Sequence, residues 1–230
     1  MAETFKKSLA SIELLAEITP KRMSELERVA RWRHCQAKEL VFDMQSSGTE
    51  VYFIVEGALQ VVNFSPAGRE VSFAQVPAGS FIGEMSAIDS KTRSATVVAI
   101  EGTVLASISS SVFQRLLLDY PKIALVVLQH LAAMVRAADE RIMDLSTLSA
   151  INRVQSELLR LAAIDEDDDN IAIISPILTH SDIAARASTT RETVSRVLSN
   201  LTRIRIIERE KDAFRVLDVK RLTNIIEASD

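Results

Sequence analysis

The sequence predicts an α+β fold in which a turn-rich β-roll precedes a mostly helical remainder. Three observations predict it. All six glycines lie between residues 48 and 102, where tight turns need them. In the same region, runs rich in β-branched and aromatic residues recur about every ten residues, as in small antiparallel rolls. After residue 102 there is no glycine, and the apolar residues follow helical spacing.

Composition limits the classes of protein to consider. The chain has 230 residues, enough for one large or two smaller cores, and a net charge of −4, so any nucleic-acid contact must come from a local basic face. A single cysteine, Cys35, excludes an internal disulfide. Residues 1–10 hold no apolar stretch typical of a secretory signal, and no run of about 18 apolar residues occurs. We therefore expect a cytoplasmic protein without a membrane segment.

The first 31 residues read as short helices, with Thr19 able to cap a helix whose first position is Pro20. Strands dominate from residue 33 to residue 109. They are expected at residues 40–42, 51–55, 59–64, 71–73, 94–100 and 104–108. Residues 66–69 should form an exposed hairpin tip.

A long helix is expected at about residues 121–148, because neither glycine nor proline occurs after Pro121 in this stretch. Its seam residues alternate spacings of four and three. They are Val127, Leu131, Met134, Ala138, Arg141, Leu145 and Leu148. This heptad pattern predicts a parallel homodimer through a helix of ~40 Å, longer than a small roll can cover. The alternative is that the apolar stripe only covers its own roll. Arg141 interrupts the seam, although Ile142 beside it could replace it.

Residues 81–98 combine the parts of a phosphate site. Gly83 lets the backbone approach a ligand, and residues 84–88 can form a helical turn with free N–H groups. Arg93 supplies a permanently charged forked donor and Ser94 a hydroxyl. Glu84, as an acceptor, suits a sugar hydroxyl better than a phosphate. The alternative is an ordinary β-turn beside a surface arginine.

The run G-E-M-S-x-x-x-x-x-T-R-S-A-T-V from residue 83 resembles the phosphate-binding cassette of cyclic-nucleotide-binding domains. The resemblance implies that Glu84 holds the ribose 2′-hydroxyl. It implies that Arg93 and Ser94, with the backbone of Gly83 and Glu84, hold the cyclic phosphate. Met85 is included with these ligand-binding residues.

Residues 178–201 contain two helical stretches around a three-residue break. Thr179 can cap the first helix, and either Thr189 or Thr190 the second; Thr189 with Glu192 fits a capping box. The second helix buries one apolar face. Its outward residues are Arg191, Glu192, Ser195 and Arg196. Residues 189–205 hold four arginines against one glutamate, so this segment is locally basic. The alternative is a pair of core helices with a charged outer face.

This segment is similar to the helix-turn-helix of the CRP/FNR family, whose second helix enters the DNA major groove. The resemblance implies that Arg191 and Arg196 read guanines, that Glu192 reads a cytosine amino group, and that Thr179 and Thr190 contact phosphates. Ser195 is placed with these DNA-binding residues. Ser188 stands where the family often has glycine. A hairpin over residues 206–217 would be the wing of a winged helix, closed by a helix at 219–228.

Together the motifs imply a cyclic-nucleotide-binding β-roll with its dimerisation helix at residues 1–148, and a winged helix-turn-helix DNA-binding domain at residues 149–230. The implied function is a cyclic-nucleotide-responsive transcription regulator. It would act as a homodimer on double-stranded DNA at a palindromic TGTGA-like site, with RNA polymerase as a further partner. The alternative is the same DNA-binding fold with cGMP, another effector or no ligand at the roll.

The chain departs from the family on the long helix, and this departure bears on the effector. The family's cyclic-AMP receptors offer adenine a Thr-Ser pair, which aligns through Pro121 with Ala138-Asp139. Asp139 can accept from the adenine amino group but also suits the donors of guanine. We expect cAMP first and cGMP second.

An enzyme and a metal site are not expected. The three histidines are scattered and form no nucleophile–base pair or metal spacing, so no catalytic residue is assigned. The acidic run at residues 165–169 lacks the glycine and the distal glutamate of a calcium loop, and reads as a solvated connector.

Overall fold

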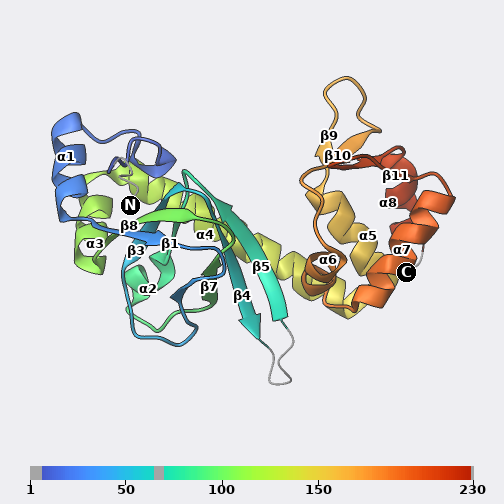
Figure 1. Cartoon of the computed structure of the whole chain (residues 1–230), viewed down its shortest axis with the longest axis horizontal. Coiled ribbons are helices and arrows are strands. Elements are labelled where there is room, and N and C mark those ends of the chain that lie inside the picture. The colour runs from blue at the N-terminus through green and yellow to red at the C-terminus, as the bar shows by residue number, and fades with distance from the viewer. Residues whose placement is uncertain (1–6, 65–69, 229–230) are drawn as a thin grey trace. The chain divides into compact units, whose positions relative to one another are not determined.

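A computed structural model describes residues 7–64 and 70–228 of the chain (Figure 1). The predicted hairpin tip at 66–69 lies outside these residues. The chain divides into two compact units, Met1–Met134 and Val135–Asp230. The division falls within the long helix α4 (Pro121–Thr147), so a functional boundary after residue 148 stays a prediction.

The N-terminal unit is the predicted roll, made of two antiparallel four-stranded sheets with the orders β1-β8-β3-β6 and β2-β7-β4-β5. The strands are β1 (Arg31–Cys35), β2 (Leu40–Phe42), β3 (Val51–Glu56), β4 (Ala58–Phe64), β5 (Glu70–Pro77), β6 (Phe81–Ile82), β7 (Thr96–Ala99) and β8 (Thr103–Ile108). The sequence prediction missed β1 and β6. The first is too polar to show strand alternation, and the second is only two residues long.

Helices precede, interrupt and follow the strands of the roll. They are the 3₁₀ turn η1 (Glu13–Leu15), α1 (Pro20–Val29), α2 (Glu84–Asp89) and α3 (Ser110–Asp119), followed by the long α4. Thr19 caps α1 as predicted, since its side chain accepts a hydrogen bond from the Arg22 N–H at 3.4 Å. Buried residues of these helices share one core with β3 and β8, which fixes the helices against one sheet.

The apolar residues of helix α4 differ in how far they are buried. Ile123 and Val127 are buried in the roll's core, whereas Leu128, Val135 and Ile142 are each about 60% exposed. By length and composition alone, α4 is apolar enough to cross a membrane, which the sequence analysis did not expect. The helix has few charged residues in its apolar part, although these residues break any continuous apolar run. A single helix of this kind is weak evidence for a membrane span.

The C-terminal unit packs helices on a small sheet of order β11-β12-β10-β9. Its elements are α5 (Ala150–Leu161), β9 (Ala163–Ile164), β10 (Ala172–Ile174), α6 (His180–Arg186), α7 (Arg191–Arg203), β11 (Ile207–Arg209), β12 (Phe214–Val216) and α8 (Val219–Glu227). The predicted helix-turn-helix, wing hairpin and closing helix are therefore all present.

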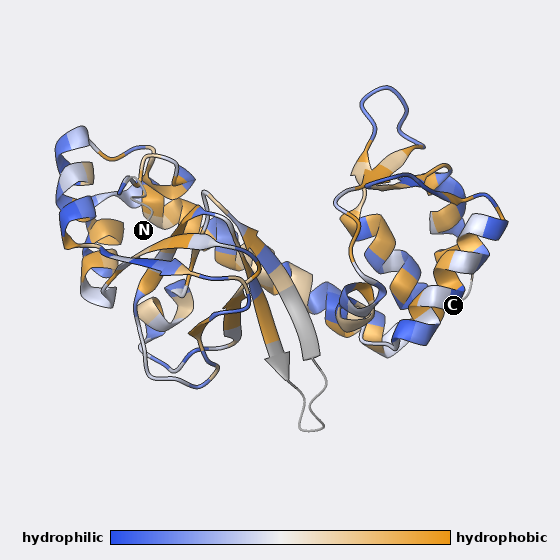
Figure 2. Cartoon of the chain, in the orientation of Figure 1, coloured by the Kyte–Doolittle hydropathy of each residue, from blue (hydrophilic) through white to orange (hydrophobic). Residues whose placement is uncertain are grey.

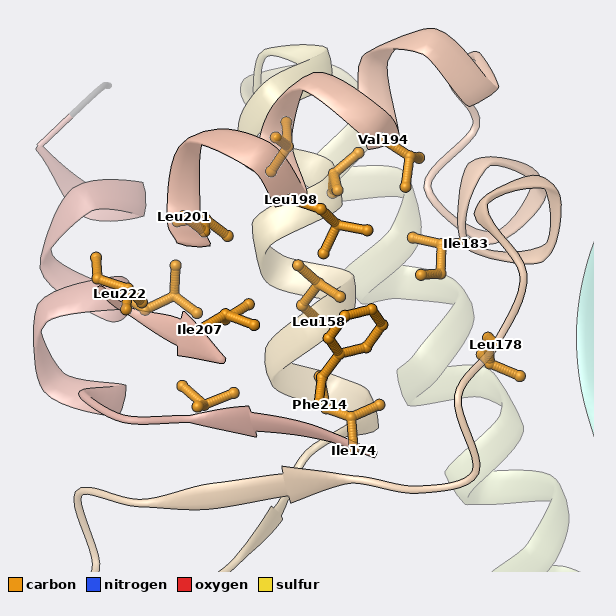
Figure 3. Packing of buried hydrophobic residues seen from close by; sticks show 14 of the residues in the cluster. Leu158, Ile174, Leu178, Ile183, Val194, Leu198, Leu201, Ile207, Phe214 and Leu222 are labelled. Carbon is orange, nitrogen blue, oxygen red and sulfur yellow. The ribbon is translucent and has the colours of Figure 1, made fainter. Parts of the chain in front are cut away.

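Apolar residues that recur at helical spacing in the sequence form the core of this unit. Val194, Leu198 and Leu201 on α7 point toward Leu158 on α5 and toward Phe214 on β12 (Figure 3). Hydrophilic residues occupy the other side of α7 (Figure 2). The core thus fixes which side chains of α7 remain available outside.

Candidate functional site

The first candidate site forms where β6 turns into α2. Gly83 has a φ of 93°, in the left-handed region that disfavours residues with a Cβ. A Cβ built there would lie 2.7 Å from the Glu50 carbonyl oxygen and 2.5 Å from Arg93 Nη1. The turn therefore requires glycine for both its backbone angle and the space around it.

Arg93 is 3% exposed and lies against this turn. Its Nη1 donates to the Gly83 carbonyl at 3.1 Å and its Nη2 to the Glu50 carbonyl at 2.7 Å. The guanidinium carbon lies 4.3 Å from the ring centre of Phe42, a cation–π distance. Burial lowers the pKa of Arg93, yet an arginine stays charged in proteins.

One donor of Arg93 is unused. Among the described residues its buried Nε has no hydrogen-bond partner. The nearest carboxylate oxygen, Glu50 Oε2, lies 3.5 Å from Nη2, and the Glu50 side chain is 39% exposed. Arg93 is thus a buried cation with one free donor, and its nearest carboxylate is partly exposed to solvent. Such a cation is suited to bind an anion.

Glu84 is the acceptor of the site and is 4% exposed. Burial raises the pKa of its carboxyl group, while the N–H groups of Glu84 and Gly83 and the nearby His130 oppose that rise. A desolvated carboxylate is a strong acceptor for an incoming hydroxyl group. Glu84 and Arg93 thus provide, a short distance apart in the fold, an acceptor and a cation.

Ser94 and Met85 complete the group on its outer side. Both are exposed, and the Ser94 hydroxyl lies 3.6 Å from the Met85 sulfur. The structure therefore brings together Gly83, Glu84, Met85, Arg93 and Ser94. Asp139 lies exposed on α4 in the other unit, so its part in the site stays a prediction.

Sequence reasoning missed several residues of this site. Phe42, Glu50 and His130 lie 51, 43 and 37 positions from Arg93 in the numbering of the chain, and none belongs to the cassette motif. The sequence pattern places Phe42 only in a strand. Nothing in the local pattern marks any of the three as a neighbour of the cassette.

The second candidate site is the pair α6 and α7. Thr179 caps α6 in a capping box with Asp182, and its hydroxyl donates to the Asp182 carboxylate at 2.7 Å. Thr190 caps α7, accepting from the Thr193 N–H at 3.3 Å. The predicted capping box of Thr189 with Glu192 is wrong, because Thr189 is buried in the turn and its N–H donates to the Ala184 carbonyl.

The first two turns of α7 present Arg191, Glu192 and Arg196 to solvent, with Ser195 half-buried beside them. The N–H of Glu192 itself and the Thr190 hydroxyl hold the pKa of the Glu192 carboxyl below its usual range, so this group is an ionised acceptor. Exposed forked donors and an ionised acceptor on one helix turn match the hydrogen-bonding edges of base pairs.

Known protein families match both halves of the chain. A family model described as a cyclic nucleotide-binding domain matches residues 32–120, and one described as a Crp-like helix-turn-helix domain matches residues 152–225. The "Cyclic AMP receptor protein" of Thermus thermophilus is 32% identical over 163 residues, covering 70% of this chain and 72% of that protein. The chain belongs to the CRP/FNR family. It is a DNA-binding transcription regulator with a cyclic nucleotide-binding domain, and not an enzyme.

Solved structures agree on the fold. A CooA mutant from Carboxydothermus hydrogenoformans superposes with a TM-score of 0.78 at 19% identity, covering 97% of both chains. A regulator from Xanthomonas campestris described as c-di-GMP responsive, CLP, superposes with a TM-score of 0.67 at 20% identity over 82% of this chain and 94% of that one. These likenesses are distant in sequence and concern the fold alone.

In this CRP/FNR regulator, a side chain from α5 holds the turn between α6 and α7. Ser188 adopts a φ of 48°, left-handed without being glycine. The Arg153 guanidinium on α5 donates to the carbonyls of Ala187 at 3.1 Å and Ser188 at 3.2 Å, and also to that of Leu148 at 2.9 Å. Sequence reasoning missed Arg153, whose hydrogen bonds stabilise the turn despite the strained residue.

We predict that Glu84→Gln stabilises the effector-free regulator at neutral pH. A carboxyl group whose pKa is raised on folding favours the folded state only at low pH, and it destabilises that state as pH rises above about 4.3, the unfolded value. The neutral amide removes this penalty. Urea unfolding should show a variant-minus-wild-type difference that grows from pH 5 to pH 8.

The exposed Glu101→Gln is the control and should show no such growth. A Glu84→Gln variant that is equally or less stable than the wild type at pH 8 would contradict the prediction.

Proposed function

We propose that the effector of this regulator is cAMP, held by Glu84 at the ribose hydroxyl and by Arg93 and Ser94 at the cyclic phosphate. The observation that supports it most is the buried Arg93, whose Nε lacks a partner among the described residues beside a glycine turn that no other residue fits. The similarity to a cyclic AMP receptor protein favours the same assignment. Met85 would contact the ligand from the outer side of the site.

The effector's base is a separate question. Asp139 is exposed on α4, where a carboxylate accepts equally from an adenine amino group or from guanine donors. A neighbour of the same fold from Xanthomonas campestris is described as c-di-GMP responsive, which supports keeping an effector other than cAMP as the alternative. cGMP is therefore the second candidate.

The exposed apolar residues of α4 support a parallel homodimer in which a second copy covers them. Such a seam would bury Met134 and Leu145, which are now exposed. A membrane is the less suitable environment, because Arg136, Asp139 and Glu140 interrupt the apolar stretch of α4. We accordingly assign the protein to the cytoplasm, with residues 1–148 as the effector and dimer domain and residues 149–230 as the DNA-binding domain.

On DNA, the homodimer would set two copies of α7 about 34 Å apart, one helical turn, on a palindromic TGTGA-like site. Arg191 and Arg196 would read guanines, Glu192 a cytosine, and Ser195 would lie at the same surface. Thr179 and Thr190, at the exposed helix starts, would contact phosphates. RNA polymerase is the expected further partner of such a regulator.

Effector binding is tested by calorimetric titration of cAMP and cGMP into wild type and Arg93→Gln. We expect loss of cAMP binding in the variant, because the charge that faces the phosphate is gone. Asp139→Ala, titrated in parallel, should change the ratio of cAMP to cGMP affinity.

Arg115→Gln, an equivalent change on the exposed face of α3, should bind as the wild type does. Unchanged cAMP binding by a folded Arg93→Gln would refute the assignment of the phosphate site. Identical cAMP and cGMP titrations in Asp139→Ala and wild type would remove Asp139 from it.

DNA reading is tested with Arg196→Ala against a TGTGA-type palindrome. A forked donor that reads a guanine contributes discrimination, so we expect about tenfold weaker binding to the palindrome with little change for random DNA. Arg203→Ala, in the last turn of α7, is the matched control. An equal loss on both DNAs would show that Arg196 contacts only the backbone.

A further inference from the structure

His130, a residue of α4 outside the cassette, lies against the effector site. Its Nε2 is 3.9 Å from Oε1 of Glu84, and its ring packs on Phe81 of β6 with ring centres 5.1 Å apart. The His130 side chain is 42% exposed, whereas that of Glu84 is 5% exposed. A partly exposed imidazole thus lies beside a buried carboxylate.

The position of His130 is fixed by the packing around it. Val127, one turn earlier on α4, is buried in the same core as Ala87 of α2, and Leu131 packs against that core. The Gln114 side chain of α3 donates to the Ala87 carbonyl at 2.7 Å and holds α2 from the other side. His130 therefore cannot leave Glu84 by a shift of α4 without disturbing these contacts.

Few other charges act on this imidazole. Between Lys122 and Arg136, α4 carries no other charged residue, and β6 contributes only Phe81 and Ile82. On α2 the charged residues are Glu84 and the exposed Asp89. Glu84 is therefore the charged group that His130 faces.

The charges of the site make this contact relevant to an anionic effector. Glu50 and Glu84 are acids, and Arg93 is the buried cation beside them, while Lys91 of the cassette is exposed. With His130 neutral, the acids outnumber the cations, which disfavours a cyclic phosphate. A protonated imidazole balances the group, and histidine is the side chain whose charge normally changes between pH 5 and 8.

We propose that His130 is a positioning residue of the effector site, whose protonated imidazole offsets the Glu84 carboxylate and so makes affinity for a cyclic mononucleotide higher at pH 6 than at pH 8. The inference rests on the proposed function, because it assumes that the anion binds beside Glu84 and Arg93. Protonation and effector binding favour each other, so a drop in pH acts in the same direction as a rise in effector concentration.

The test is titration of cAMP into the full chain at pH 6 and pH 8 at one ionic strength. Wild type should bind about three- to fivefold more weakly at pH 8, the range expected for a partly exposed ion pair. His130→Gln should bind at both pH values as the wild type does at pH 8. His130→Lys, which keeps its charge, should bind more tightly than His130→Gln at pH 8.

His34→Gln, a change of the exposed histidine of β1, is the matched control and should keep the wild-type pH dependence. The inference is overturned when His130→Gln retains that dependence. Failure of the wild type to bind cAMP at either pH contradicts the proposed effector instead.

A second measurement tests the pair without any effector. Melting temperatures of wild type, His130→Gln, Glu84→Gln and the double variant form a double-mutant cycle. We expect a coupling of about 1–2 °C at pH 6 that is smaller at pH 8, because an imidazole normally loses its charge between pH 5 and 8. A cycle without coupling at pH 6, or with equal coupling at both values, overturns the inference.

Discussion

The contact on which the effector half depends is the one between the buried Arg93 guanidinium and the carbonyls of Gly83 and Glu50. A buried cation is costly unless it is well partnered. Here Nη1 and Nη2 donate to the two carbonyls, and the buried Nε has no hydrogen-bond partner among the described residues. The same side chain therefore fixes the backbone of the cassette and keeps a charge ready for an anion. Gly83 allows this approach because a Cβ would collide with both of its neighbours.

The DNA-binding half rests on a different constraint, the packing of one face of α7. Val194, Leu198 and Leu201 fill the core with Leu158 and Phe214, so the opposite side of the helix must face outward (Figure 3). The caps at Thr179 and Thr190 fix where each helix begins, and Arg153 stabilises the turn between them. The outward arginines are thus placed by the apolar residues that pack in this core.

Much of this was predictable because it is local. Glycine positions, helix periodicity and the cassette spacing are short-range signals, and they predicted the roll, the long helix and the helix-turn-helix. The sequence did not predict β1, because Arg31–Cys35 has no alternation of polar and apolar residues. It left the cap of α7 open between Thr189 and Thr190, because two adjacent threonines are equivalent in sequence. Glu50, His130 and Arg153 could not be found, since their roles arise only when distant segments meet. The part proposed for Asp139 at the effector's base stays a prediction, because Asp139 lies on α4 in the other unit.

The central claim is that a small anion captured by Glu84 and Arg93 controls DNA binding by the other half of the chain. The most direct measurement is the affinity of the full-length protein for a TGTGA-type palindrome, with and without saturating cAMP, at one stated salt concentration. The account predicts tighter binding with cAMP, by about tenfold or more, and no such gain in Arg93→Gln. Equal affinity with and without the nucleotide, in a protein that binds both cAMP and the palindrome, would contradict it.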